Sequence, residues 1–267
     1  MNHLDELENK SVFIIREGWQ RFKNSALLWS IGKDSTTLLW LCRKAFFGKL
    51  PFPVIHIDTT FKFPEMYAFR EKYAKEWGLN LLVEKNEEAL ARGISYNNSD
   101  AFTCCHELKT VALQQTILKR RVEALLVGIR RDEHNIRAKE RYFSSRDIEF
   151  KWDYKNQAAE MWDHYQREAN AGKHFRIHPL LHWTEIDIWE YIERENIPIN
   201  ELYFAKNGQR YRSLGCMPIT KPIQSEADDV HKIIEEIKNS STPERAGRAQ
   251  DKEQAYTMQK LRSLGYM

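Results

Sequence analysis

The 267-residue sequence lacks a long apolar run, and no stretch approaches the roughly 20 residues that a membrane-spanning helix needs. Its first residues, Met1-Asn-His-Leu-Asp-Glu-Leu-Glu, are acidic and lack the basic and apolar regions of a signal peptide. Only four cysteines occur, so a disulfide framework is not expected. We therefore expect a soluble, cytoplasmic protein that makes no contact with membranes.

Net charge is also low, at +3, and by itself it does not imply binding to nucleic acid. The basic residues nevertheless cluster in two stretches, Arg130–Arg146 and Arg210–Arg212. Clusters of this kind are typical of surfaces that contact nucleic acid, so we take both stretches as candidate DNA contacts.

The stretch from Ser25 to Trp40 predicts a strand, a tight loop and a helix. Residues 26–29 form an apolar run that suits a buried strand, and apolar residues recur at helical spacing after the loop. Gly32 permits a tight turn, and the helix N-terminus directs backbone N–H groups toward one point. We interpret the loop as a cradle for phosphate or pyrophosphate; a commonplace turn is the alternative. The candidate ligands are Ser30, Gly32, Lys33, Asp34, Ser35 and Thr36, of which Lys33 and Asp34 are also candidate catalytic residues.

Strand-like and helix-like segments alternate along the chain. Buried-strand patterns lie at 53–58, 79–83, 124–128 and 174–181, and helical patterns at 3–23, 64–77, 105–120, 184–195, 226–239 and 251–264. Residues 84–103 have the composition of a polar loop, and residues 134–173 that of an excursion with short helices. This alternation predicts an α/β fold with a mostly parallel sheet and helices on both faces.

Ligands of such sheets bind beyond the carboxyl ends of the strands, where further candidates lie. His56 and Asp58 end one strand, and the Asp58 carboxylate suits a ribose or adenine donor or Mg²⁺ held through water; capping of the next turn explains it equally well. Gly128 ends another strand and precedes Arg130 and Arg131, whose guanidinium groups suit phosphate or sulfate oxygens. A solvated charged surface is the alternative for this run.

The loop S-I-G-K-D-S resembles the S-G-G-K-D-S loop of the N-type ATP pyrophosphatases, with Ile31 in place of the first glycine. Other stretches resemble the phosphoadenosine-phosphosulfate reductase family, and in particular the small catalytic subunits of bacterial ATP sulfurylases, over nearly the whole chain. These stretches are P-F-P-V-I-H-I-D-T (51–59), K-F-P-E-M (62–66), G-I-R-R-D-E (128–133), R-A-K-E-R (137–141), H-W-T-E-I-D-I-W (182–189), R-Y-R-S-L-G-C (210–216) and E-R-A-G-R (244–248).

The resemblance implies an adenine-nucleotide α-hydrolase-like (Rossmann-like) fold. Residues 1–200 would form the ATP-binding domain with its PP-loop and a lead-in helix, and residues 201–267 a helical or irregular extension packed over the active site. The resemblance also implies cleavage of ATP between the α- and β-phosphates with Mg²⁺, so that an oxyanion is adenylated and pyrophosphate is released. In the sulfurylases the oxyanion is sulfate, and the partner is a GTPase large subunit.

The pair Cys104-Cys105, followed by Lys109, resembles the cysteine pair of adenylylsulfate reductases and of the ATP pyrophosphatase of DNA phosphorothioation. In those relatives a second pair completes the ligands of a [4Fe–4S] cluster, whereas here the distant site holds only Cys216. Three interpretations stay open: the cysteines bind a cluster with one open iron, carry a persulfide, or are small buried residues.

Sulfate needs no thiol to be adenylated, so the cysteines favour another acceptor. Our leading hypothesis is a DNA backbone phosphate that is adenylated and then receives sulfur through Cys104, Cys105 or Cys216, with a cysteine desulfurase and DNA-modification components as partners. Sulfate adenylation with a GTPase subunit is the alternative. Reduction of adenylyl sulfate is disfavoured because the end of the chain, S-L-G-Y-M, lacks the cysteine nucleophile of the reductases.

Overall fold

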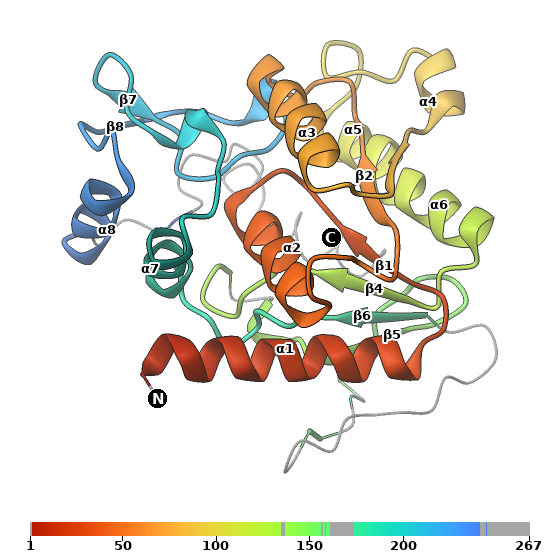
Figure 1. The fold of residues 1–267 in the computed structure, drawn as a ribbon. Coiled ribbons are helices and arrows are strands. Elements are labelled where there is room, and N and C mark those ends of the chain that lie inside the picture. The colour runs from red at the N-terminus through yellow and green to blue at the C-terminus, as the bar shows by residue number, and fades with distance from the viewer. Residues whose placement is uncertain are drawn as a thin grey trace.

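A six-stranded sheet forms the centre of the protein (Figure 1). The computed structural model describes residues 2–134, 137–155, 157, 159–160, 174–240 and 244. The strands are β1 (Ser25–Leu28), β2 (Val54–Ile57), β3 (Leu81–Glu84), β4 (Ala124–Val127), β5 (Phe143–Arg146) and β6 (His174–Ile177). Their order is β3-β2-β1-β4-β6-β5, and all neighbours are parallel except β5 and β6. The predicted mostly parallel sheet is confirmed.

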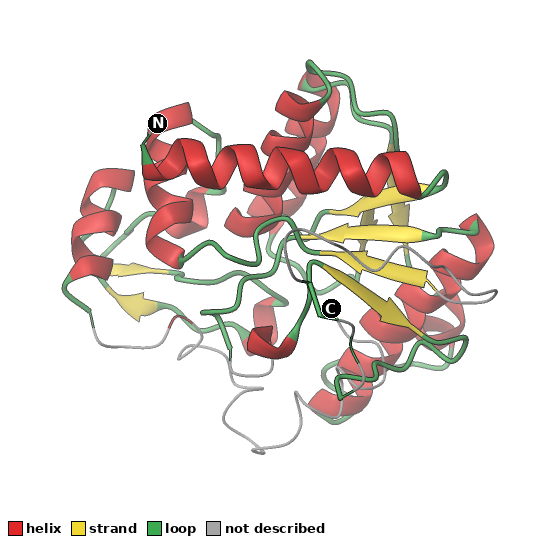
Figure 2. Ribbon diagram, turned by 90° about the horizontal axis from the view of Figure 1, so that it is seen from below, coloured by secondary structure: helices red, strands yellow, loops and turns green. Residues whose placement is uncertain are grey.

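Helices cover both faces of the sheet, as the alternation of strands and helices predicted (Figure 2). Successive side chains of a strand point to opposite faces, so Leu27 of β1 joins one hydrophobic core and its neighbours Ala26 and Leu28 join the other. The first core is completed by α1 (His3–Arg21), α2 (Lys33–Ala45), α3 (Pro64–Glu76) and α7 (Glu185–Glu195), and the second by α6 (Ala112–Arg120). Burial on both faces explains why the central strands are almost wholly apolar.

In two segments the structure differs from the prediction made from the sequence. The segment 134–173 contains β5, which was not predicted because its sequence, F-S-S-R, has no strand pattern and gains its hydrogen bonds from β6 far along the chain. The same segment also contains a short 3₁₀ helix, η2 (Arg137–Lys139).

The polar loop 84–103 holds the short helix α4 (Glu87–Ala91) and the start of α5 (Ala101–Cys105). Between α5 and α6 the chain forms a π-helical turn, η1 (His106–Val111), so that the helix predicted from residue 105 starts earlier and changes pitch.

The chain after α7 forms short elements and one helix. They are η3 (Glu201–Tyr203), β7 (Gln209–Arg210), η4 (Met217–Ile219), β8 (Ile223–Gln224) and α8 (Val230–Lys238). Helix α8 corresponds to the helix predicted at 226–239, whereas the one at 251–264 lies outside the described residues. The division into residues 1–200 and 201–267 stays a prediction. Within the described ranges, no helix has the length and apolarity to cross a bilayer.

Candidate active site

The loop between β1 and α2 has the backbone of an anion cradle. Gly32 is the extended N-cap of α2, and no side chain caps the helix there. Ile31, which stands where the related loops have glycine, adopts a left-handed backbone with φ 66°. This conformation costs a β-branched residue on the order of 1–3 kcal/mol. Ile31 is held in it because its side chain is buried in the first hydrophobic core.

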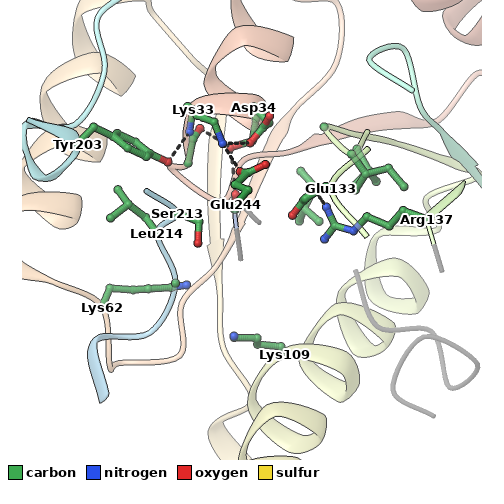
Figure 3. Close-up of a pocket in the computed structure, with 18 residues that line it drawn as sticks. Lys33, Asp34, Lys62, Lys109, Glu133, Arg137, Tyr203, Ser213, Leu214 and Glu244 are labelled. Atoms are coloured by element: carbon green, nitrogen blue, oxygen red, sulfur yellow. Dashed lines mark hydrogen bonds and ion pairs between the residues drawn. The ribbon is translucent and has the colours of Figure 1, made fainter. Parts of the chain in front are cut away.

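A cavity of about 130 Å³ lies over this loop (Figure 3). Five of the predicted ligands line it, namely Ser30, Gly32, Lys33, Asp34 and Ser35, together with Gly128 at the end of β4. The hydroxyls of Ser30 and Ser35 are 3.0 Å apart, and that of Ser35 donates to the Gly32 carbonyl. The loop therefore offers helix N–H groups, hydroxyls and one ammonium to a single space, the donor set that phosphate groups require.

Lys33 is the most constrained member of the cradle. Its side chain is completely buried, and its Nζ atom lies 3.2 Å from the Asp34 carboxylate and also pairs with Glu244. Its backbone N–H donates to the Tyr203 hydroxyl at 2.8 Å. Lys33 is held on both sides by carboxylates and is therefore fixed in position, which suits an electrostatic role.

Arg130 lies directly behind the cradle. The guanidinium is completely buried and donates to the carboxylates of Asp34, Asp132 and Glu244. Burial lowers the pKa of Arg130, but the neighbouring carboxylates raise it above its usual value. Arg130 thus fixes Asp34 at the start of α2.

The Arg131 side chain does not reach the cavity. Its guanidinium lies over the ring of Tyr142, 5.4 Å from the centroid, and the residue does not line the cavity. Of the two predicted oxyanion contacts, the structure therefore places Arg130 next to the cradle and Arg131 away from it.

Three other predicted ligands do not line the cavity. The Thr36 hydroxyl accepts a hydrogen bond from the Trp29 indole at 3.1 Å. The His56 ring is hydrogen-bonded to the Trp29 carbonyl, and burial together with the charge of Lys62 lowers its pKa to about 3. Asp58 accepts from the Thr60 N–H at 2.8 Å and from the Tyr67 hydroxyl at 3.0 Å.

The environment of Asp58 fits the turn-capping alternative. Burial raises the pKa of Asp58, but these two hydrogen bonds lower it below its usual value. The carboxylate is therefore used to hold the turn after β2.

The three cysteines of interest meet at a second, much smaller cavity. Cys104, Cys105 and Cys216 line it together with apolar side chains, and Cys216 directly follows Gly215, which lines the main cavity. Burial, followed by the nearby Cys105 and Cys216, raises the pKa of Cys104 to about 11. Among the residues that the structure describes, no group of three or more His, Cys, Asp or Glu side chains is arranged to hold a metal ion.

Several arginines of the two basic stretches face the interior, and DNA contact by these stretches stays a prediction. Their central arginines are buried and paired with carboxylates inside the protein. The pairs are Arg130 with Asp34, Asp132 and Glu244, Arg137 with Glu133, Arg146 with Glu140, Arg210 with Glu236, and Arg212 with Glu185. Each of these five guanidinium groups is neutralised locally, so these arginines add little positive charge to the surface.

Sequence reasoning missed several residues of the main cavity. Lys62 and Lys109 extend into it from the side opposite the loop, and their amine ends point toward one another (Figure 3). Tyr203 and Glu244 come from the last third of the chain. Lys62 begins the K-F-P-E-M stretch and Lys109 follows the cysteine pair, so their motifs were the only available signal.

Known proteins resemble this chain in family, sequence and fold. Residues 24–222 match the family described as "Phosphoadenosine phosphosulfate reductase domain". The chain is 41% identical to sulfate adenylyltransferase subunit 2 of Bacteroides fragilis and 42% identical to that of Pseudomonas putida, with 100% of this chain and 98% of each relative covered.

Solved structures share the fold at lower identity. Phosphoadenylyl-sulfate reductase from Candida auris superposes with a TM-score of 0.55 at 21% identity, over 81% of this chain and 95% of that one. FMN adenylyltransferase from Candida glabrata, in complex with FAD and inorganic pyrophosphate, superposes with a TM-score of 0.56 at 19% identity. The match covers 82% of this chain and 65% of that one. The chain belongs to the phosphoadenosine phosphosulfate reductase domain family, and it resembles sulfate adenylyltransferase subunit 2 over its whole length.

Proposed function

We propose that this protein is an adenylyltransferase that transfers the AMP part of ATP to sulfate and releases pyrophosphate. The observation that carries the proposal is the buried Lys33 at the start of α2, in a cavity whose loop presents N–H and hydroxyl donors. The full-length similarity to sulfate adenylyltransferase subunit 2 supports sulfate as the acceptor. Sulfate therefore replaces the DNA phosphate of our leading sequence hypothesis.

The reaction is an in-line displacement at the α-phosphorus. A sulfate oxygen forms the new bond to phosphorus while the bond to the β-phosphate bridging oxygen breaks, and that electron pair leaves with pyrophosphate. The loop from Ser30 to Ser35 holds the leaving pyrophosphate, and Lys33 neutralises the charge that develops on it. Lys62 and Lys109, on the opposite side of the cavity, supply positive charge where the two anionic reactants must approach each other.

Mg²⁺ fits the oxygen ligands that the cavity offers. Asp34 and Glu133 line it, and carboxylates with phosphate oxygens are the ligand set that Mg²⁺ prefers. When bound there, the ion would neutralise charge on the polyphosphate.

The test is sulfate-dependent release of pyrophosphate from ATP. We expect Lys33→Ala to lower the rate about 100- to 1,000-fold, the usual effect of removing a preorganised electrostatic contact. Lys206→Ala is the matched control, because Lys206 is an exposed lysine paired with Glu201. Release that does not require sulfate, or that is unaffected by Lys33→Ala, contradicts the proposal.

The word "subunit" in the names of the relatives points to a partner chain, and we propose a GTPase large subunit. The activity assay should therefore be run with and without that subunit. Activity of the isolated chain equal to that of the complex would contradict a requirement for the partner.

A second acceptor, a DNA backbone phosphate that receives sulfur with the help of a cysteine desulfurase, is favoured by one observation. Cys104, Cys105 and Cys216 meet at one cavity next to the main one. The double change Cys104→Ser with Cys105→Ser separates the two functions, because sulfate adenylation uses no thiol. We expect full sulfate-dependent release of pyrophosphate in this variant. Release that depends on DNA and a persulfide donor in the wild type, and that is lost in this variant, would favour sulfur transfer.

A further inference from the structure

The pyrophosphate cradle already contains an anion supplied by the protein itself. Glu244 points its carboxylate into the cavity toward Lys33 (Figure 3). One carboxylate oxygen pairs with the Lys33 ammonium and the other with the Arg130 guanidinium, and the Glu244 side chain is only 6% exposed. The Lys33 ammonium in the cradle and the Arg130 guanidinium behind it are thus both bound by one internal carboxylate.

The position of this carboxylate is one that an incoming phosphate needs. An oxygen bound to the Lys33 ammonium at hydrogen-bond distance excludes a second oxygen from the same position. Burial raises the pKa of Glu244, but Arg130 and Lys33 lower it well below its usual value, so the group is ionised at neutral pH. A polyphosphate oxygen that takes the position of Glu244 on Lys33 must therefore displace a charged, buried carboxylate.

We propose that Glu244 is an internal competitor in this cradle, and that it keeps single tetrahedral anions out while pyrophosphate and ATP still enter. The inference rests on the proposed function, since sulfate would be both the substrate and the anion most in need of exclusion. Sulfate has the shape of one phosphate group, and sulfate bound at Lys33 would block ATP.

The competition has a simple thermodynamic form. An internal competitor lowers, by the same factor, the binding affinity of every anion that needs the same position. A single anion makes few contacts, so this competition raises its dissociation constant above the millimolar range. Pyrophosphate and ATP would make further contacts with the loop N–H groups and with the hydroxyls of Ser30 and Ser35, which line the cavity, so their binding would stay tight despite the same penalty.

The experiment measures binding of inorganic phosphate, sulfate and pyrophosphate to the full chain by isothermal titration calorimetry. The variants are Glu244→Gln and Glu244→Ala, of which the second leaves no amide to replace the carboxylate. Glu236→Gln is the matched control, because Glu236 also pairs with a buried arginine, Arg210, but does not line the cavity. Thermal unfolding verifies that each variant is folded.

We expect both Glu244 variants to bind all three anions about 10-fold more tightly, by the same factor, and the control to match the wild type. Sulfate should then inhibit ATP binding at millimolar concentration only in the Glu244 variants. Weaker or unchanged pyrophosphate binding would overturn the inference, since it would mean that Glu244 holds the cradle in place. These titrations measure binding and need no turnover. If the wild-type protein did not adenylate sulfate, the proposed function would be refuted, but the titrations would still test the role of Glu244.

Discussion

Replacing Gly128 with alanine tests how the cradle is held in place. Gly128 follows β4 and packs against the start of α2, where an added Cβ would lie 3.0 Å from the Asp34 carbonyl group and from the Ser35 Cα atom. All of these atoms belong to the backbone, so no side chain can rotate away. The loop and the first turn of α2 must shift by a few tenths of an ångström to admit the methyl group.

The size of the effect follows from this contact. Overpacking of a buried site costs about 1–3 kcal/mol. For a chain of this size each kcal/mol lowers the melting temperature by about 2–4 °C, so a mid-range cost predicts a loss of about 4–8 °C. Because the loop is shifted from its position over the cavity, we also expect it to bind pyrophosphate more weakly than the wild-type loop does.

The assay pairs thermal unfolding with calorimetric titration of pyrophosphate, and Gly32→Ala is the control for stability. An added Cβ at Gly32 would find its nearest neighbours, the hydroxyls of Ser30 and Tyr203, at an ordinary 3.5 Å. The backbone there has φ −81°, which alanine adopts freely. We expect Gly32→Ala to be as stable as the wild type or more stable by up to about 1 kcal/mol. Gly128→Ala with wild-type stability and affinity would refute the idea that close packing on β4 positions the loop.

Three further predictions concern other buried groups. Arg146→Met removes the guanidinium that donates to the buried Glu140 at 2.8 Å, so urea unfolding should show that the free energy of unfolding falls by about 3–5 kcal/mol. A variant that lost DNA binding but kept its stability would contradict the burial of Arg146. Cys104, with its pKa raised to about 11 by burial and the neighbouring thiols, should react with iodoacetamide at pH 8 about 100-fold more slowly than a free thiol, and rapid labelling by mass spectrometry would contradict this. Burial and nearby cations lower the pKa of His56 to about 3 and of His174 to about 2, so both stay uncharged in the folded protein while the unfolded chain takes up protons below about pH 6.5. Stability is therefore retained above pH 6.5 and falls as the pH is lowered, by up to about 2 kcal/mol per histidine at pH 5; unfolding of His56→Gln should show a shallower pH dependence, and an unchanged one would refute this account.

The sequence predicted those parts of the site that depend on neighbours in the chain. A buried strand, a glycine turn and a helix start require only local spacing, which is why the loop from Ser30 to Ser35 was found. The parallel sheet followed for the same reason, since alternating strands and helices leave few ways to bury both faces. Prediction failed for β5, because its strand conformation comes from pairing with β6 and not from its own residues.

The arginines show why the acceptor side of the site was harder to predict from the sequence. In sequence they form two positive clusters, but some of their carboxylate partners lie outside these clusters: Arg212 bonds Glu185, 27 residues away, and Arg130 bonds Asp34, 96 residues away. The other partners, Asp132, Glu133 and Glu140, lie within the first cluster, and a count of its basic residues overlooks them. Only the folded chain shows that these charges cancel inside the protein.

The sequence by itself determined the loop between β1 and α2, the α/β sheet around it and the family to which the chain is related, because contiguous stretches of residues indicate each of them. Tertiary structure alone decided what stands opposite that loop. It placed Lys62 and Lys109 across the cavity, gathered three cysteines at a second one, and set Glu244 against Lys33, 211 residues earlier. Contacts over such separations depend on how the whole chain packs, and no local pattern records them.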